Sequence, residues 1–433
     1  MTRVLLLATT TGYQIRSFGE AAERLGVRLV FASDRCDRLE DPWWDQAIPI
    51  RFHDPPHSID AVVSACAGAP PPAAVLAVGD RPAVLAADVA DALGLRGNTP
   101  AAARASRNKV ASRNAFKSAG LPTPLFREVS LSDDSSALAA ECAYPAVIKP
   151  LSLSGSRGVM RVDDERAFVR SFDRLRRLMR SPDILIERDP VHEQALIESY
   201  VPGHEFAVEG VLTDGGLRVF AIFDKPEPLV GPFFEETVYV TPSTASAEVQ
   251  AAIVEHIAVA ARALGLSHGP VHAECRVNTG GVYVLEVAPR PIGGLCSKAL
   301  RFRVPGGPRD AERPGAEPAA SLEEVLLRHA LGEDISGYEP QRSASGVMMI
   351  PIPRRGVYRS VAGVETARAV VGVDEVRITA KADEILLPLP EGHSYLGFIF
   401  ASGVDPASVA QSLRDAHGRL VFVIEREIAV ASR

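Results

Sequence analysis

The sequence has few of the features that mark membrane, secreted or disulfide-stabilised proteins. Its 433 residues contain no apolar run near the ~18 residues that a membrane-spanning helix needs. The apolar run from Val4 to Ala8 is too short for the core of a signal peptide. The five cysteines are scattered and never in C-x-x-C spacing, which argues against disulfides and a structural zinc site. We therefore expect a cytoplasmic protein with no membrane partner.

Excess positive charge is also absent. Lys and Arg number 47 against 54 Asp and Glu, which gives a net charge of −7. This balance argues against a nucleic-acid partner held mainly by phosphate contacts. Only six of the basic residues are lysines, so each lysine is a candidate for a specific role.

Several common catalytic signatures are missing as well. The sequence contains no G-x-x-x-x-G-K-[ST] phosphate loop, no G-x-G-x-x-G after its first strand, no H-E-x-x-H and no G-x-S-x-G. A nicotinamide-dependent enzyme, a zinc peptidase and a serine hydrolase are each disfavoured.

The first hundred residues alternate between short apolar runs and helical patterns. Residues 4–8 and 28–32 read as strands around a helix that ends at Gly26, and residues 74–78 read as a further strand before a helix that closes at Gly94. Strands that alternate with helices favour a parallel sheet covered on both faces. We predict an α/β, Rossmann-like N-terminal domain over residues 1–100.

The remainder predicts an α+β organisation in further domains. Residues 146–149 read as a strand, 195–223 as three strands, 247–264 as a helix and 271–287 as a hairpin. Residues 302–320 are rich in Pro and Gly and lack periodicity, which is typical of a flexible linker or insertion. We assign residues 101–301 to a central catalytic region and 321–433 to a C-terminal α+β region.

The hairpin brings two acidic residues together. A three-residue loop, Thr279-Gly280-Gly281, would pair Asn278 with Val282 and set Glu274 directly opposite Glu286. By alternation, His272, Glu274 and Arg276 share one face, and Val284, Glu286 and Ala288 share a face of the returning strand. Facing carboxylates repel, and a divalent cation such as Mg²⁺ would remove that cost. A solvated face with two unrelated acids explains these two residues equally well.

Two other segments carry weaker signals. Lys149 ends a strand just before a loop of small residues at 151–158, where backbone amides and an ammonium group could meet phosphate oxygens. A surface lysine before an ordinary turn is the alternative. Two strands meet at Pro202-Gly203, with acids at Glu198 and Glu205, and an acid beside a turn is usually solvated.

Taken in order, these segments resemble the ATP-grasp superfamily and, within it, the L-amino acid ligases. The resemblance spans nearly the whole chain. It is carried by Lys109, by Lys149-Pro150 and its loop, by Glu198-Ser-Tyr-Val-Pro-Gly-His-Glu205, and by Glu274 followed by Glu286-Val-Ala-Pro-Arg290. Residues 345–349 and 395–403 are similar to the extra C-terminal lid of this group.

The resemblance implies an ATP site. Lys109 and Lys149 would hold the phosphates, and Lys149 would also take part in catalysis. The loop 152–158 would close over the phosphates through its backbone amides, those of Ser154, Gly155 and Ser156 among them. Glu198 would accept a hydrogen bond from the adenine amino group, Tyr200 and Val201 would form the adenine hinge, and Glu205 would bind the ribose hydroxyls.

The resemblance also implies a reaction centre. Glu274 and Glu286 would ligate Mg²⁺, or Mn²⁺ in its place, and Arg290 would stabilise the transferring phosphoryl group. Gly293 and Gly294 would offer backbone amides to the substrate. The implied reaction joins the carboxylate of an amino acid to an amine through an acyl phosphate, with release of ADP and phosphate. A homodimer is expected on the same ground.

Three positions leave alternatives open. Many relatives have Asn where this chain has Ala288, which bears on how many metal ions bind. His272 is either a substrate-binding or a structural residue, and Asp80 either holds a substrate ammonium group or caps a helix. Two other functions also stay open: a carboxylating or formyl-transferring ATP-grasp enzyme of purine metabolism, and a weakly catalytic ATP-binding module.

Overall fold

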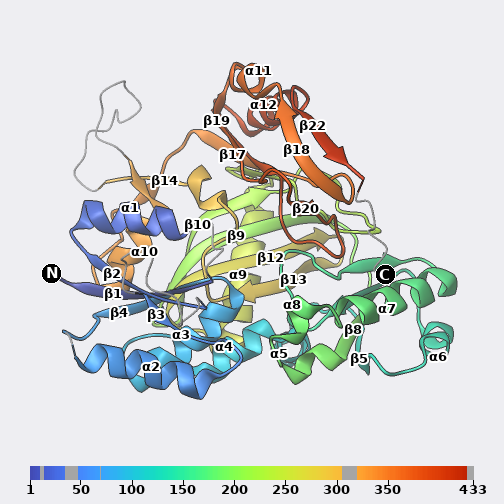
Figure 1. Ribbon diagram of the computed structural model, residues 1–433, viewed down its shortest axis with the longest axis horizontal. Helices are drawn as coiled ribbons and strands as arrows, with labels where there is room; N and C mark the ends of the chain where they lie inside the picture. Colours follow the sequence, from blue (N-terminus) through green and yellow to red (C-terminus); the bar gives the residue numbers. More distant parts are fainter. Residues whose placement is uncertain (10–13, 35–46, 69, 305–318, 427–433) are drawn as a thin grey trace.

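The computed structural model describes residues 1–9, 14–34, 47–68, 70–304 and 319–426. Within them the N-terminal region is a parallel four-stranded sheet with helices on both faces (Figure 1). β1 is buried from Val4 to Ala8, as expected for a central strand covered on both sides. The elements are β1 (Arg3–Ala8), α1 (Ile15–Leu25), β2 (Arg28–Ser33), β3 (Ile48–Pro49), α2 (Pro55–Ala67), β4 (Ala74–Val78) and α3 (Asp80–Ala92).

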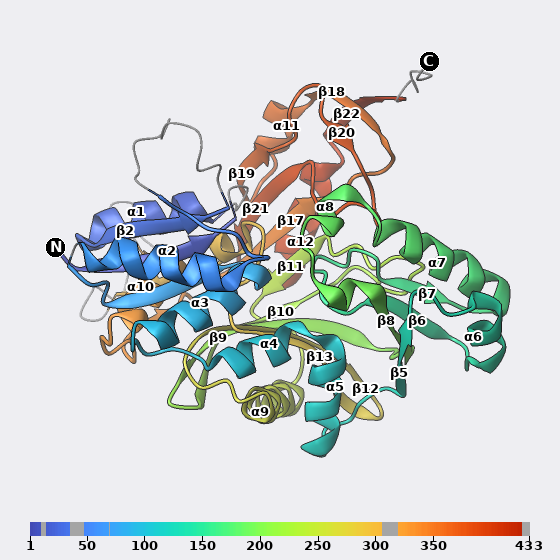
Figure 2. The ribbon, with the colours of Figure 1, turned by 60° about the horizontal axis from the view of Figure 1, so that its bottom comes forward.

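Two helices lead from this region into a four-stranded sheet, β5-β8-β6-β7, on the opposite side of the molecule (Figure 2). The Asn108 side chain accepts hydrogen bonds from the Val110 and Ala111 amides at 3.0 Å, so it caps α5 and places Lys109 at the first helical position. The elements are α4 (Pro100–Arg107), α5 (Lys109–Ser118), β5 (Phe126–Ser130), α6 (Ser135–Glu141), β6 (Ala146–Pro150), β7 (Met160–Val162), α7 (Glu165–Leu178), α8 (Pro182–Leu185), η1 (Pro190–Glu193) and β8 (Gln194–Ser199).

The centre of the molecule is an eight-stranded sheet with the order β13-β12-β9-β10-β11-β17-β21-β19. The apolar side chains of β12 and β13 pack against one face of α9. The last three strands come from the C-terminal region, so part of the predicted lid continues the central sheet. The elements are β9 (His204–Thr213), β10 (Gly216–Asp224), β11 (Val238–Thr241), α9 (Ala247–Ala263), β12 (Gly269–Asn278), β13 (Gly281–Ala288), β17 (Ala344–Ile350), β19 (Val373–Ile378) and β21 (Gly397–Gly403).

The remaining elements form two small sheets, β15-β14-β16 and β20-β18-β22. Of the predicted linker, residues 305–318 lie outside the described residues. After it, α10 packs on the N-terminal region, where Glu324 pairs with Arg24 of α1 at 3.2 Å. The elements are η2 (Cys296–Ala299), β14 (Arg301–Arg303), β15 (Ala320–Ser321), α10 (Leu322–Ala330), β16 (Glu339–Pro340), β18 (Gly356–Ala362), α11 (Val364–Arg368), β20 (Ile385–Leu386), α12 (Pro406–His417) and β22 (Val421–Glu425).

The predicted fold class is confirmed, because a parallel N-terminal sheet is combined with several antiparallel sheets. The three strands predicted within 195–223 are β8, β9 and β10, and the predicted helix at 247–264 is α9. The domain boundaries stay predictions.

The predicted loop of the β12–β13 hairpin is wrong. Asn278 pairs with Gly281, so the turn has two residues rather than three, and a β-bulge follows between the pairs Cys275–Val284 and Glu274–Glu286. The bulge adds back the residue that the shorter turn removes, so Glu274 still lies opposite Glu286. Because of the bulge, Val284 and Glu286 lie on opposite faces of the hairpin. Val284 packs toward α9, so the prediction that it shares a face with Glu286 is wrong.

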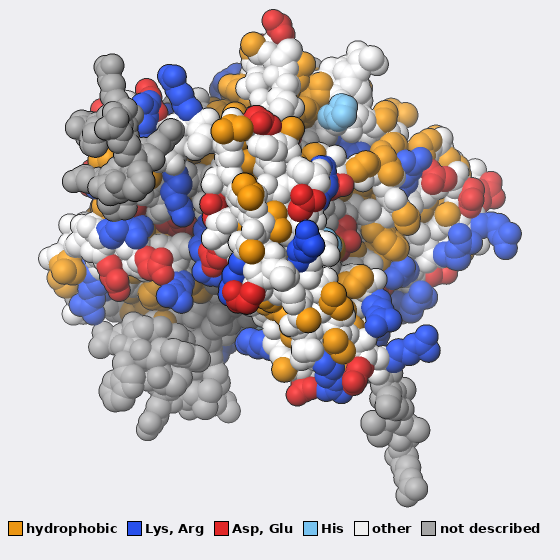
Figure 3. All heavy atoms as spheres, turned by 90° about the horizontal axis from the view of Figure 1, so that it is seen from above, with side chains coloured by type: hydrophobic (Ala, Val, Ile, Leu, Met, Phe, Trp, Pro, Cys, Tyr) orange, Lys and Arg blue, Asp and Glu red, His pale blue; other side chains and the backbone are white. Residues whose placement is uncertain are grey.

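No helix among the described residues is long and apolar enough to cross a membrane. On the face that Figure 3 displays, basic and acidic side chains are interspersed rather than gathered into one field.

Candidate active site

The carboxylate of Glu198 on β8 binds two cationic side chains. Its Oε1 accepts a hydrogen bond from Arg113 Nε at 2.6 Å, and its Oε2 pairs with Lys149 Nζ at the end of β6. All three side chains are buried. Burial lowers the pKa of the Lys149 ammonium to about 8, against the attraction of Glu198. Because a carboxylate has about four acceptor positions, Glu198 keeps the capacity to accept from another donor.

Arg113 is fully buried and links this pair to the β12–β13 hairpin. Its Nη1 donates to the carbonyls of Val284 at 3.3 Å and Leu285 at 2.9 Å, which are the residues of the bulge. The side chain that contacts Glu198 therefore also supports the backbone that turns Glu286 toward Glu274. Arg113 lies four residues after Lys109 on the same helix, but nothing in the sequence pattern separated it from a surface arginine.

The loop after β6 has backbone amides without acceptors among the described residues, and a hydrogen bond from Lys109 holds one end of it. Gly155 and Ser156 have φ values of 62° and 55°, and Lys109 Nζ donates to the Leu153 carbonyl at 2.8 Å. Among the described residues, the amides of Ser154, Gly155 and Ser156 have no hydrogen-bond acceptor. Successive free amides with left-handed backbone form an anion-binding concavity. The predicted phosphate loop thus has a backbone suited to that role.

The C-terminal region holds the other end of this loop. The Gly158 amide donates to the Pro390 carbonyl at 2.9 Å, and Arg157 Nε donates to the Glu391 carbonyl at 2.8 Å. The Glu391 carboxylate accepts two hydrogen bonds from Arg174 of α7, at 2.6 and 2.8 Å. Pro390 and Glu391 of the C-terminal region therefore hold the end of the predicted phosphate loop.

Three carboxylates gather around one ammonium group on the central sheet. Lys225, just after β10, lies 2.8 Å from Glu205, 3.2 Å from Glu236 and 2.9 Å from Glu274. One oxygen from each of these acids lies within 4.8 Å of the others. Burial and the neighbouring Glu274 raise the pKa of Glu236 to about 7, and the Tyr239 hydroxyl donates to Glu236 at 2.6 Å.

Glu205 therefore lies in the acidic cluster, although its predicted partner is a ribose. Arg276 Nε donates to its second oxygen at 2.8 Å, and Arg276 Nη1 donates to the Val201 carbonyl at 2.8 Å. Next to them, the guanidinium of Arg161 lies 4.3 Å from the centre of the Tyr200 ring. The Val201 amide has no acceptor in the part of the chain that the structure describes. The predicted hinge residues thus lie together.

Glu286 faces a different cation. Arg290 Nη2 lies 3.8 Å from Glu286, while Arg290 Nε and Nη2 donate to the two oxygens of Asp80 at 2.8 and 3.4 Å. Asp80 is the first residue of α3, so a side chain of the N-terminal region orients Arg290, which lies in the loop after β13. The Arg290 guanidinium outweighs burial and lowers the pKa of the Asp80 carboxyl. Asp80 is neither the N-cap, which is Gly79, nor a free carboxylate.

His272 lies between two acids. Its Nδ1 is 3.3 Å from Glu209, which is fully buried, and its Nε2 is 3.6 Å from Glu274. Burial opposes the charged form, but the two carboxylates raise the pKa of His272 to about 9. Glu209 also accepts from the Ile292 amide at 3.1 Å, just before Gly293 and Gly294. These contacts favour the structural alternative for His272.

The donor set fits a hard divalent cation. The acids at 205, 236, 274 and 286 offer only oxygen ligands, which Mg²⁺ and Mn²⁺ prefer. Of these residues, the sequence reasoning missed Glu236 together with Lys225. A usable signal existed for Lys225, which is one of six lysines and directly follows a strand. Glu236 lies in the connection between β10 and β11, where no pattern marked it.

Comparison with known proteins gives two family matches. Residues 142–299 match the ATP-grasp domain, and residues 348–425 match the L-amino acid ligase C-terminal domain 2. Together the two segments make up more than half of the chain.

Comparisons with individual proteins agree with these two family matches. Alanine–anticapsin ligase of Bacillus subtilis (strain 168) is 30% identical over 202 residues, which are 44% of this chain and 42% of that protein. The chain therefore matches less than half of this relative's length. The L-amino acid ligase of Bacillus licheniformis has a similar fold, with a TM-score of 0.78 at 24% identity over 98% of this chain and 99% of that one. The biotin carboxylase domain of 2-oxoglutarate carboxylase from Hydrogenobacter thermophilus, solved with ADP and magnesium, has a TM-score of 0.63 at 16% identity over 97% and 90% of the two chains.

Proposed function

Because residues 142–299 match the ATP-grasp domain and residues 348–425 match the C-terminal domain 2 of the L-amino acid ligases, we propose that the chain joins an amino-acid carboxylate to an amine. ATP-grasp enzymes use ATP and a divalent metal ion. In the proposed reaction a substrate carboxylate attacks the γ-phosphate, ADP leaves, and an amine then displaces phosphate from the acyl phosphate to give an amide. The charge distribution of the site carries this proposal.

The first step needs positive charge around the triphosphate. Lys109, Lys149 and the amides of residues 154–156 are the proposed phosphate ligands, and Arg290, oriented by Asp80, faces the charge that develops during transfer. Glu274 and Glu286 are the proposed ligands of Mg²⁺ or Mn²⁺, which neutralises phosphate charge when bound. Glu198, Tyr200, Val201 and Glu205 are the proposed contacts of the nucleoside.

The second step needs protection from water. An acyl phosphate reacts with water as well as with an amine, so the site must stay closed while the amine attacks. The contacts of Pro390 and Glu391 with Gly158 and Arg157 support such closure. Arg290 and the amides of Gly293 and Gly294 are the proposed contacts of the acyl group. The L-amino acid ligase C-terminal domain favours this reaction over the carboxylating alternative.

A substrate screen tests the proposal. Pairs of amino acids and amines are incubated with ATP and Mg²⁺, phosphate release is followed, and products are identified by mass. The expected result is one ADP and one phosphate per amide, formed only when both substrates are present. AMP and pyrophosphate as products, or ATP hydrolysis that depends on bicarbonate or formate, would contradict it. Tight ATP binding without stimulation by any amino acid would favour the weakly catalytic module.

A further inference from the structure

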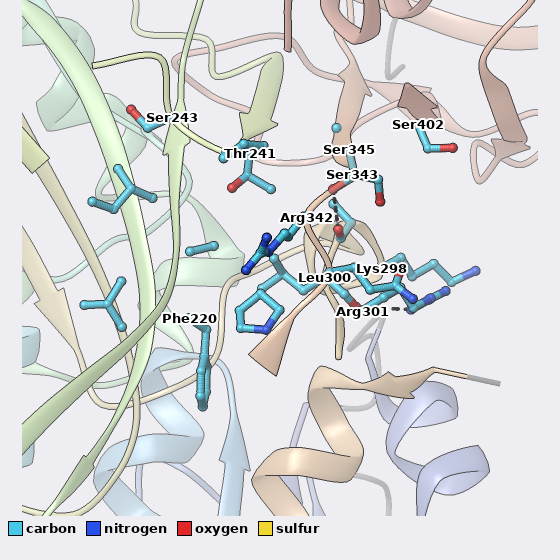
Figure 4. Close-up of a pocket in the computed structure, with 18 of the residues that line it drawn as sticks. Phe220, Thr241, Ser243, Lys298, Leu300, Arg301, Arg342, Ser343, Ser345 and Ser402 are labelled. Atoms are coloured by element: carbon cyan, nitrogen blue, oxygen red, sulfur yellow. Dashed lines mark hydrogen bonds between the residues drawn. The ribbon is translucent and has the colours of Figure 1, made fainter. Parts of the chain in front are cut away.

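A second cavity lies away from the candidate active site. Its volume is about 1050 Å³, and its walls come from β10, α9, the segment 298–301, the segment 340–343 and β21 (Figure 4). None of the residues proposed to bind ATP, metal or the acyl group lines it. This volume is at the upper end of the range for small-molecule sites.

One wall of the cavity is an open strand edge. β10 runs from Gly216 to Asp224 and pairs with β9 on one side, with a β-bulge between Val219 and Ala221, but on its other side it shares one pair with β11, Asp224 opposite Val240. Val219 to Ile222 line the cavity on this side. In an antiparallel strand, alternate residues direct their N–H and C=O groups away from the paired neighbour. The cavity thus presents peptide-group donors and acceptors beside apolar side chains, and the bulge between Val219 and Ala221 interrupts their regular alternation.

The charges that line the cavity are balanced. Lys298 pairs with Glu375 at 2.9 Å and lies over the Phe400 ring, and Glu375 also pairs with Arg377 at 2.6 Å. Arg342 and Arg301 remain on the basic side, and Glu255 and Asp374 on the acidic side; none of the four forms an ion pair with a described residue. In Figure 4 the Arg342 side chain points into the cavity, whereas Arg301 and Lys298 lie together on another wall.

We propose that this cavity binds a short peptide with free termini, extended along the edge of β10. The strand edge supplies main-chain hydrogen bonds, as in the addition of a peptide strand to a sheet. Arg342 binds the C-terminal carboxylate, and an acid at the rim, Glu255 or Asp374, binds the N-terminal ammonium. A polyanion would face the two acids, and a single amino acid would leave most of the edge unpaired. The site is independent of the ligase chemistry proposed above.

Calorimetric titration of the full chain with trialanine, without ATP or Mg²⁺, tests this site. We expect saturable 1:1 binding that weakens at least tenfold in Arg342→Glu and is lost in Ala251→Trp, which fills the cavity from α9. Arg16→Glu reverses a charge on exposed α1, and Ala247→Trp adds the same ring on α9 outside the cavity; both should bind within twofold of the unchanged protein. Trialanine amide should bind at least tenfold more weakly, and free alanine should give no heat.

Several results would overturn the proposal. One is the absence of trialanine binding to the folded protein. Another is equal binding of free alanine, which would assign the cavity to amino acids. Binding that survives both Arg342→Glu and Ala251→Trp and is competed away by Mg·ADP would place the peptide in the ligase site instead.

Discussion

On the β6–β8 side of the candidate site one carboxylate serves two cations, whereas on the β9–β12 side three carboxylates surround one ammonium. Glu198 is shared by Lys149 and Arg113, and Lys109 lies on the same side. Lys225 is shared by Glu205, Glu236 and Glu274. The first group has an excess of positive charge, whereas the acids of the second are matched by Lys225, by Arg276 against Glu205 and by His272 near Glu274.

This difference indicates what each side receives. Buried charges are costly unless they are paired, so an uncompensated excess marks a place where a ligand of opposite charge completes the site. The cationic side has such an excess and suits phosphate oxygens, whereas the acidic side offers several carboxylate oxygens, the ligands that a divalent cation prefers. Four predictions test this division, from the largest expected effect to the smallest.

Removing one charge from the acidic side should have the largest effect. Glu274→Gln keeps the shape of the side chain but loses a proposed metal ligand. Changes at residues that only orient a metal ligand cost 10–100-fold, so we expect amide formation at fixed Mg²⁺ to fall at least about 100-fold. Phosphate release measured against Mg²⁺ concentration checks this. Glu248→Gln, a change at an exposed acid in the first turn of α9, is the matched control, and unchanged turnover in Glu274→Gln would refute the metal assignment.

Breaking the cationic side should act first on stability. Arg113→Met leaves a buried carboxylate with one partner fewer and frees the bulge carbonyls, so we expect a loss of about 3–5 kcal/mol in the free energy of unfolding. Urea denaturation measures it. The matched change Arg127→Met breaks the exposed pair with Glu141 and should cost at most about 1 kcal/mol. Equal losses in the two variants would mean that the Arg113 network contributes no more than a surface pair.

The pH profile should report the charge of Lys149. Its pKa of about 8 predicts that kcat/KM for ATP falls about tenfold per pH unit above pH 8, as the ammonium loses its proton. Deprotonation of Lys149 does not itself destabilise the fold over this range. The folded-state pKa lies below the ordinary 10.5, so between about pH 8 and 10.5 the unfolded chain binds more protons, and this group's contribution to stability rises with pH. In Lys149→Arg the basic limb should disappear; its persistence would assign the limb to another group.

Loosening the lid from the phosphate loop should have the smallest effect. Glu391→Gln removes the ion pair between Glu391 and Arg174. Both side chains are about a third exposed, Arg174 at 37% and Glu391 at 35%. Such a pair is worth at most about 1 kcal/mol, or about fivefold in an equilibrium. We expect the ratio of ADP to amide to rise up to about fivefold, because water reaches the acyl phosphate more often. Glu384→Gln, a change outside this contact, should leave the ratio of ADP to amide near one, as in the unchanged protein.

Several elements followed from the sequence because their signals are local. Short apolar runs placed β1, β4 and β6, and helical spacing placed α1 and α9. The hairpin register predicted from the loop placed Glu274 opposite Glu286, although that loop was predicted with one residue too many. The pairing was right because the bulge compensates for the shorter turn, and nothing in the local pattern distinguishes the two solutions.

The remaining site residues had no local signal. Glu236 meets Glu274 because β10, β9 and β12 are neighbours in the sheet, and Asp80 meets Arg290 because the N-terminal region docks against the loop after β13. These contacts join residues that are far apart in the sequence. Their partners depend on strand order and docking, which a period of 2 or 3.6 residues does not encode.

The amino-acid sequence by itself determined which segments form strands and helices, which faces are apolar, and which residue types are available for phosphate and metal. Only the tertiary structure decided which charges meet: that Glu198 faces two cations, that Lys225 faces three acids, and that β10 keeps one edge open. The physical reason is the separation along the chain over which each kind of interaction acts. Backbone periodicity acts between residues a few positions apart, whereas electrostatic pairing in a buried site depends on distances that only the packed chain defines.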